Sequence, residues 1–254
     1  MKHINSLLSD YRESVARDAL VLTILGVVLA VLAAAYVVSN PEVYKTPLSI
    51  ADSLILISRT YYFGTLVAPV TVISFWMISR YDLRFNRIIL EAGYHQVWTR
   101  QAVKMFITVF LVTLFLLAVA LILGAVFGES VVNFNQRGSL FSLFAYQNTI
   151  ANPSIIYIGL IFFTRNILVL ATITTFSLLL DWLGVWRWLT LTFVIGIGLL
   201  ESINTTLGIF YSRVSIEYVS WLDRGSFNLG QAVLILVFLF ACGWIIARKK
   251  GECL

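Results

Sequence analysis

Two charged residues, Arg165 and Glu201, lie inside otherwise apolar stretches and are the first candidates for chemistry in this sequence. A charge at the centre of a membrane helix costs about 2.5–3.5 kcal/mol on insertion scales, so residues of this kind usually serve a function. The turn DWLGVWR joins the two stretches, and the charges lie 19 and 17 residues from its midpoint, Gly184. At 1.5 Å per residue their depths then agree within about 3 Å. An ion pair is therefore predicted, unless Arg165 reaches the outer headgroups and Glu201 faces an outer vestibule.

Patterns typical of catalysis or metal binding are missing from the sequence. The two histidines, His3 and His95, are far apart, and neither has metal-ligand spacing around it. No nucleophile elbow, no H-E-x-x-H motif and no Walker-type phosphate loop occurs. The sequence therefore predicts a protein that is not an enzyme and that has no cofactor or metal of its own.

A second candidate site is the charged stretch from Ser79 to Lys104, SRYDLRFNRIILEAGYHQVWTRQAVK. Its pattern predicts a short helix with a polar face and an apolar face, which Gly93 would end. The polar face would hold Arg80, Arg84, Arg87, Glu91 and His95, and the apolar face Phe85, Ile88, Ile89 and Ala92. Two interpretations remain open for such a helix: it presents side chains to a partner, or it lies on the inner leaflet.

The composition identifies the solvent that surrounds these elements. The chain has 254 residues, of which 59% are hydrophobic and 12% charged, whereas a soluble domain is about half apolar and a quarter charged. Lipid is therefore the expected solvent. In a membrane protein, the net charge of +5 indicates contact with anionic lipid or a soluble partner, and no nucleic-acid partner is expected.

Six apolar runs are long enough to cross a bilayer, which takes about 20 residues. They are residues 19–38, 60–79, 105–128, 155–180, 188 onward and 226–247. Six spans place both termini on one side, and that side carries 12 Lys and Arg against 5 on the other. The bias predicts that both termini and the charged stretch are cytoplasmic. We therefore predict an all-α integral membrane protein with one six-span domain over residues 19–254.

Residues 1–18 are predicted to form a separate amphipathic helix in the inner headgroup layer. Asp10, Glu13 and Asp18 argue against a cleaved signal peptide, whose first region is short and basic. The apolar face of this helix would consist of Ile4, Leu7, Leu8, Tyr11 and Val15.

The segment RYDLRFNRIILEAGYHQVWTRQAVKMF resembles the link between the second and third spans in permeases of the type-2 class of ABC exporters. The matching features are the apolar Ile88–Leu90, Gly93, a polar turn at Tyr94–Gln96, and Lys104 at the start of the third span. The N-terminal helix resembles the elbow helix of that family, and the six-span layout agrees with it. In detail the likeness covers about 25 residues, and Arg80 stands where the family often has an acidic residue.

The resemblance implies that the charged segment is a cytoplasmic coupling helix, seated in a separate ATP-binding subunit that holds ATP and Mg²⁺. The coupling residues would be Arg87, Ile88, Ile89, Leu90, Glu91, Ala92 and Gly93. One six-span subunit forms half of a pathway, so the resemblance also implies a second copy or a related permease in the plasma membrane, exporting a peptide or another amphiphile. Two alternatives stay open: a non-transporting accessory or self-protection protein, and a secondary transporter, which would usually show inverted repeats and broken helices.

Overall fold

The protein is a bundle of helices in the part of the chain that the computed structural model describes. The backbone is described for residues 2–39, 47–79, 93–134, 139, 154–204 and 225–252, and the side chains for residues 18–39, 47–59, 61–79, 93–134, 139, 154–204 and 229–250. Every regular element within these ranges is a helix, apart from an isolated parallel bridge between Ser49 and Ser130. The prediction of an all-α protein is confirmed for these ranges.

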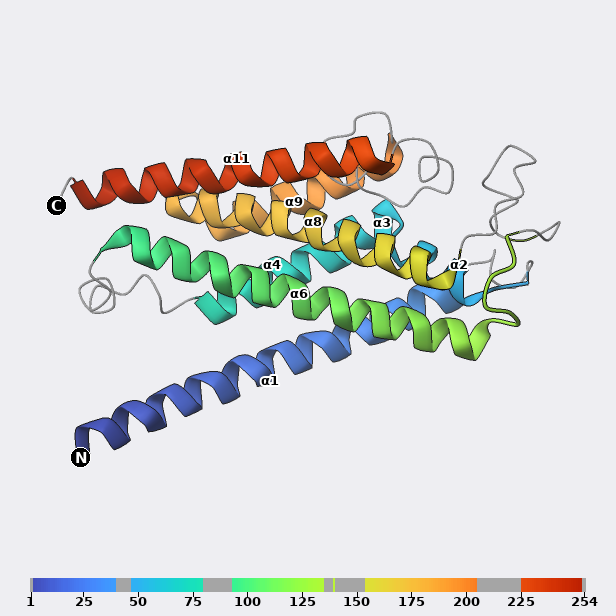
Figure 1. Ribbon diagram of the computed structural model, residues 1–254, viewed down its shortest axis with the longest axis horizontal. Helices are drawn as coiled ribbons and strands as arrows, with labels where there is room; N and C mark the ends of the chain where they lie inside the picture. The colour runs from blue at the N-terminus through green and yellow to red at the C-terminus, as the bar shows by residue number, and fades with distance from the viewer. Residues whose placement is uncertain are drawn as a thin grey trace.

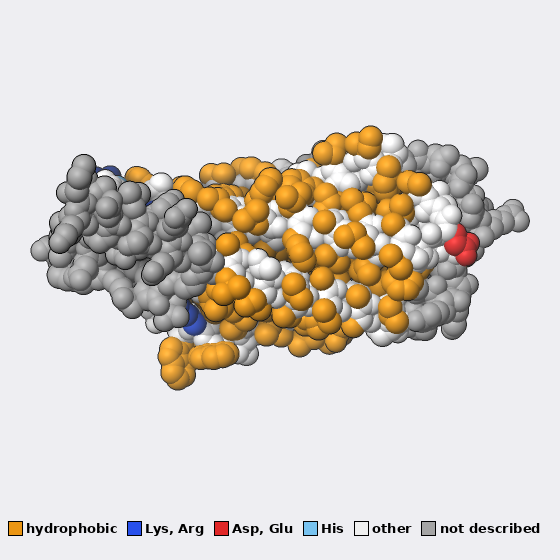
Figure 2. Space-filling model, turned by 90° about the horizontal axis from the view of Figure 1, so that it is seen from below, with side chains coloured by type: hydrophobic (Ala, Val, Ile, Leu, Met, Phe, Trp, Pro, Cys, Tyr) orange, Lys and Arg blue, Asp and Glu red, His pale blue; other side chains and the backbone are white. Residues whose placement is uncertain are grey.

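Four described helices are long and apolar enough to cross a membrane. They are α1 (Lys2–Ser39, with its apolar part at Asp18–Ser39), α6 (Tyr94–Phe127), α8 (Ile155–Trp182) and α11 (Gly225–Glu252, with its apolar part at Leu229–Lys250). They run along the long axis of the bundle, and α1 begins at the end where α11 finishes (Figure 1). The face seen from below is covered with hydrophobic side chains (Figure 2), as expected for a membrane protein whose outer surface meets lipid.

The other two predicted spans correspond to shorter helices inside the bundle. Residues 60–79 form α3 (Thr60–Tyr62), the π-helical turn η1 (Phe63–Val67) and α4 (Ala68–Ser79), and the fifth run forms α9 (Arg187–Ile203). A span takes about 20 residues, and α9 has 17. By length and composition, four of the described helices are able to cross a membrane, and the six-span layout stays a prediction.

A short helix precedes α3 and is separated from it at Ser58 and Arg59. The sequence did not predict this helix. A separate helix, α2 (Ile50–Ile57), begins at a capping box in which Ser49 and Asp52 bond each other's backbone N–H groups. The Ser53 hydroxyl donates to the carbonyl of Ala120 in α6 (2.6 Å), and the N–H of Ile50 donates to the carbonyl of Ser130 (3.0 Å). These bonds hold α2 against the end of α6.

The first helix departs from the predicted elbow. Residues 2–18 are helical, as predicted, and α1 continues without a break to Ser39, so a separate elbow helix is not confirmed and the division at residue 18 stays a prediction. The physical reason is that no Gly or Pro occurs before Gly26, and nothing else in the sequence stops the helix. The side chains of the predicted apolar face, Ile4, Leu7, Leu8, Tyr11 and Val15, lie outside the described residues, and their place in the headgroup layer stays a prediction.

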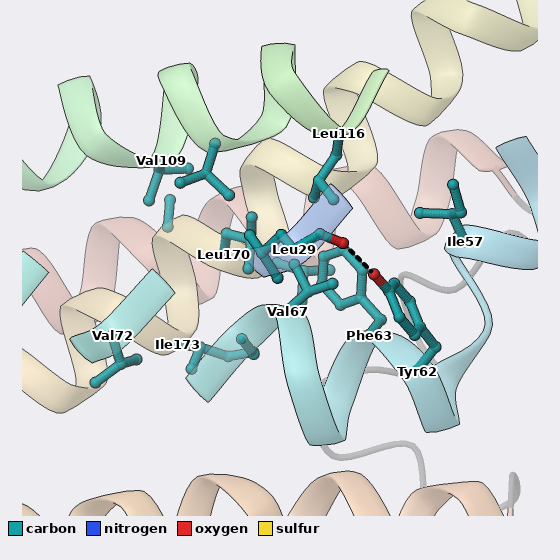
Figure 3. Close-up of a cluster of buried hydrophobic side chains, with 14 of the residues drawn as sticks. Leu29, Ile57, Tyr62, Phe63, Val67, Val72, Val109, Leu116, Leu170 and Ile173 are labelled. Atoms are coloured by element: carbon teal, nitrogen blue, oxygen red, sulfur yellow. Dashed lines mark hydrogen bonds between the residues drawn. The ribbon is translucent and has the colours of Figure 1, made fainter. Parts of the chain in front are cut away.

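The core lies where α1, η1, α6 and α8 meet. Leu29, Leu116 and Leu170 are at most 1% exposed, and Figure 3 shows them in one cluster with Phe63 and Val67, with Tyr62 at its edge. The Tyr62 hydroxyl donates to the carbonyl of Leu29 (3.2 Å). Because lipid is as apolar as the core, packing and such hydrogen bonds, more than apolar burial, position helices in a membrane.

Candidate functional site at the basic end of the bundle

Trp182, the last residue of α8, is the centre of a cluster at the end of the bundle where α1 and α6 begin and α11 finishes. Its indole N–H donates to Oε1 of Gln101 in α6 (2.7 Å). Its ring meets the rings of Trp98 and Tyr94 edge to face, with centroids 5.6 and 6.2 Å apart. Tyr94, Trp98 and Gln101 lie on one face of α6 in its first two turns. All three contact Trp182, so this single side chain of α8 packs against the start of α6.

Lys250 of α11 completes the attachment of Trp182. Its ammonium donates to the carbonyl oxygen of Trp182 (2.5 Å) and lies 5.7 Å from the centre of the indole ring. The last carbonyls of a helix have no partner within the helix and carry partial negative charge, so a lysine is favoured there. The cation–π contact adds to this attraction. Lys250 therefore ties the end of α11 to the end of α8.

Trp98 packs against α11 where that helix has no side chain. The Trp98 ring is fully buried and lies 6.0 Å from the ring of Phe240. A Cβ atom at Gly243 would fall inside contact distance of Cζ2 and Cη2 of Trp98, and 2.7 Å from its Cε2. Gly243 is thus required by the close approach of the indole.

The turn between α8 and α9 carries a second anchor. The Arg187 guanidinium donates from Nε and Nη2 to the two carboxylate oxygens of Asp181, both at 2.9 Å, and lies 5.6 Å from the ring of Trp76 in α4. The hydrogen bonds to Asp181 raise the pKa of Arg187 further above its usual range. The predicted tight turn is confirmed, since Gly184 adopts φ +82° between the two helices.

Exposed tryptophans and basic side chains gather at the same end of the bundle, as is typical of a membrane–water boundary. Trp186 and Trp188 are 79% and 73% exposed, and tryptophan prefers the headgroup level. The basic side chains described near it are Arg100, Lys104, Arg187, Arg248, Lys249 and Lys250. We call this region the basic end.

The predicted coupling segment attaches at the basic end. Arg87, Ile88, Ile89, Leu90, Glu91 and Ala92 lie outside the described residues, whereas Gly93 is described and adopts φ +136°. That conformation favours glycine, and Gly93 is the residue that precedes α6; whether it also ends a helix before it stays a prediction. Immediately after it α6 begins, so the polar turn expected at Tyr94–Gln96 is wrong: these residues form the first helical turn. The helix starts there because Gly93 itself makes the change of direction.

Arg165 and Glu201 are both enclosed by protein, at 1% and 0% exposure. The alternative, in which Arg165 reaches the outer headgroups and Glu201 faces an outer vestibule, stays a prediction. α9 packs chiefly against α3, η1 and α4 and less against α8. The close approach involves Gly198, where a Cβ would lie 2.8 Å from the carbonyl carbon of Gly64. The ion pair between Arg165 and Glu201 stays a prediction.

Sequence reasoning missed the aromatic cluster around Trp182. The available signal was the spacing of Tyr94, Trp98 and Gln101, which are four and three residues apart and share one helix face. The contribution of Lys250 from α11 left no such signal, because its partner lies 68 residues away in the chain.

The arrangement at the basic end joins α4, α6, α8, α9 and α11 through aromatic, cation–π and ionic contacts, and it is suited to holding these helices together. Among the described residues, no three His, Cys, Asp or Glu side chains are grouped to hold a metal ion. Comparisons of the chain with protein-family models, with curated proteins and with solved structures give no match.

Proposed function

We propose that this protein is the membrane subunit of an ATP-driven exporter, and that residues 80–92 connect it to a separate cytoplasmic ATPase subunit that binds ATP and Mg²⁺. The basic end is then the cytoplasmic end, in the plasma membrane. A second copy or a related permease supplies the other half of the pathway, and a peptide or another amphiphile is the substrate.

The observation that carries this proposal is the attachment of residues 80–92 to two packed helices. In the chain, residues 80–92 connect Ser79, the buried last residue of α4, with Gly93, directly before α6. α4 and α6 pack against each other. Tyr94, Trp98 and Gln101 in the first turns of α6 hold Trp182. A displacement of the segment is therefore passed to α4, α6 and α8 together, as a coupling element requires.

The test is recovery of the ATPase. The tagged protein, purified from membranes of its native cell after mild cross-linking, is expected to bring down a polypeptide with a phosphate-binding loop. Glu91→Lys in the coupling segment should reduce that recovery, or separate ATP hydrolysis from export, without reducing the amount of protein in the membrane.

The matched control is Glu129→Lys, the same charge change at an exposed residue beyond the opposite end of α6. It should leave recovery unchanged. Failure to recover any ATPase with the unmodified protein would overturn the proposal. Equal recovery of the ATPase with Glu91→Lys and Glu129→Lys would show that Glu91 is not part of the contact with the ATPase.

A second candidate, a secondary transporter, is favoured by one observation. The stretch from Ile50 to Ser79 is divided into α2, α3, η1 and α4, and interrupted helices are typical of such transporters. π-helical turns also occur often at functional sites. Purified protein in sealed vesicles without ATP distinguishes the two: substrate movement driven by an ion gradient alone would support this candidate.

A further inference from the structure

Two consecutive residues at the end of α8, Asp181 and Trp182, are bonded to side chains of three other helices. The carboxylate of Asp181 accepts two hydrogen bonds from Arg187 of α9. Trp182 is bonded twice: its indole N–H donates to Gln101 of α6 (2.7 Å), and its carbonyl oxygen accepts from the ammonium of Lys250 of α11 (2.5 Å). We call Asp181 and Trp182 the junction, because α6, α9 and α11 are all attached there.

The two bonds to Trp182 use different groups of that residue. Gln101 holds the side chain and Lys250 holds the backbone, so each bond restricts the same residue from a different helix. Trp182 and Gln101 are 2% and 1% exposed, so water cannot replace their hydrogen bond when it breaks. The buried N–H and the buried amide oxygen would then lose their partners, which costs more than an ordinary hydrogen bond contributes. Separating α6 from α8 at the junction is therefore unfavourable.

Few other polar contacts tie α6 to α8 along their described lengths. Buried hydroxyls further along the two helices donate to a carbonyl of their own helix; these are Thr108, Thr113, Thr172 and Ser177. The Thr175 hydroxyl reaches the sulfur of Met105 at 3.9 Å, and a thioether is a weak acceptor. Because lipid is as apolar as the helix faces, hydrogen bonds between helices help to decide which helices stay together. Among the described side chains, the bond between Gln101 and Trp182 is thus the main polar link between α6 and α8.

The junction also lies close to the start of α6. Tyr94, the first residue of α6, already contacts the Trp182 ring, with centroids 6.2 Å apart. Trp98 contacts the same ring (5.6 Å) and packs against Gly243 of α11. α11 in turn packs along α8 toward the end at which α6 begins (Figure 1). A displacement of the first turns of α6 therefore acts on α8 and α11 at once.

We propose that Trp182 is a positioning residue for the coupling movement: it makes α8 and α11 follow the start of α6 as one body. Arg187 extends the connection to α9 and, through its contact with Trp76, to α4. For the origin of the movement this inference rests on the proposed function, in which an ATPase displaces residues 80–92. The link through Trp182 itself is a property of the fold and is measurable without a partner.

The first test measures whether Gln101 and Lys250 act through one residue. Gln101→Leu and Lys250→Met are made singly and together, and unfolding of the purified protein in mixed micelles is followed by circular dichroism as the fraction of sodium dodecyl sulfate rises. If both bonds fix Trp182, losing one weakens the effect of losing the other, so the double variant should unfold at a higher detergent fraction than additivity predicts. Lys249→Met, at the neighbouring exposed lysine, is the matched control and should combine additively with Gln101→Leu.

Replacing Trp182 shows whether the effect passes through this residue. Trp182→Phe removes the N–H that donates to Gln101 and keeps an aromatic ring. In this background the non-additivity between Gln101→Leu and Lys250→Met should disappear. Strict additivity with Trp182 present, or equal non-additivity with Trp182→Phe, would overturn the link through Trp182.

The second test measures movement in the complex with the recovered ATPase. Spin labels are placed on exposed residues of α6, α11 and α1, at Val103, Ile245 and Leu20, in a background with Cys242→Ser and Cys253→Ser. Distances between the labels are compared with and without a non-hydrolysable ATP analogue, and α1 is the reference because the described bonds of the junction do not include it. The nucleotide should change the distance from Val103 to Leu20 and leave the distance from Val103 to Ile245 unchanged, because α6 and α11 move together.

Weakening the junction should separate α6 from α11. In the double variant Gln101→Leu with Lys250→Met, the distance from Val103 to Ile245 should change when the nucleotide binds, whereas Lys249→Met should behave as the unmodified protein does. An unchanged distance in the double variant, or a changed one in the unmodified complex, would overturn the positioning role and leave the proposed function intact. If the nucleotide changes neither distance in the unmodified complex, the proposed function is overturned as the source of the movement, and the unfolding measurements decide the link through Trp182.

Discussion

Replacing Gly243 with alanine should disrupt the contact that holds α11 against α6. The added Cβ would fall inside contact distance of Trp98 Cζ2 and Cη2, and 2.7 Å from its Cε2. Trp98 has no room to move, since it is fully buried and packed against Trp182 and Phe240. The variant must therefore displace α11 or force the indole away from its preferred position.

The magnitude follows from comparing two glycines of the same helix. Gly230 has nothing within 4 Å of an added Cβ, so Gly230→Ala should raise the free energy of unfolding by up to about 1 kcal/mol through helix propensity. Gly243→Ala has the same propensity gain, but overpacking costs about 1–3 kcal/mol. The difference between the two variants isolates the steric cost, and we expect it at the upper end because both the backbone and the ring are fixed.

The assay is unfolding of the purified protein in mixed micelles as the fraction of sodium dodecyl sulfate rises, followed by circular dichroism. Trp98→Phe supplies the second half of a double-mutant cycle, because it shortens the ring without losing a hydrogen bond: the Trp98 N–H has no partner. The new methyl group then fills space that the shorter ring leaves, so the double variant should be more stable than additivity predicts. Equal stability of Gly243→Ala and Gly230→Ala, or strict additivity in the cycle, would refute this reasoning.

Three further predictions concern charges and topology. Asp181→Asn should lower the free energy of unfolding by no more than about 1 kcal/mol, because the partly exposed Arg187 is screened by water, and the loss should shrink as salt increases. In the unmodified protein, the ion pair between Asp181 and Arg187 should be insensitive to pH from about 6 to 9, since the raised pKa of Arg187 keeps the guanidinium charged. Arg165→Leu and Glu201→Leu should each lower expression, and the double variant should recover much of the loss; additive losses would count against a pair. Cys253 should resist a membrane-impermeant thiol reagent in intact cells, and labelling there would invert the topology.

The long apolar helices could be predicted from the sequence because they depend on local composition. The runs that became α1, α6, α8 and α11 were each located to within a few residues at one end or both. A helix satisfies its backbone hydrogen bonds within itself, as lipid requires, and the length of each run shows that the helix can cross the bilayer. The turn at Gly184 could also be predicted, since it needs a conformation that glycine adopts most easily.

The interruption before α3 was not readable. The residues from Ile50 to Ile57 are as apolar as those of a span, and besides the local capping box of Ser49 and Asp52, bonds to α6 and to the segment after it hold them as a separate helix. The π-helical turn at Phe63–Val67 could not be predicted from the sequence either. The Thr65 hydroxyl satisfies the carbonyl of Tyr61 there (2.6 Å), and the close approach of Gly198 fixes the neighbouring helix. These features depend on residues far apart in the chain.

By itself, the sequence determined that this chain is helical and that it contains runs long and apolar enough to cross a membrane, because both properties follow from local composition and periodicity. The tertiary structure decided which side chains meet. In the folded chain Lys250 bonds to the end of α8, and Trp98 packs against Gly243. Arg165 and Glu201 are buried inside the bundle, and a groove lies between α1 and α6. The physical reason is that apolar side chains gain as much from lipid as from one another. Hydrophobicity therefore places a helix in the membrane without choosing its neighbours, and the choice rests on hydrogen bonds, charges and close fits between distant residues.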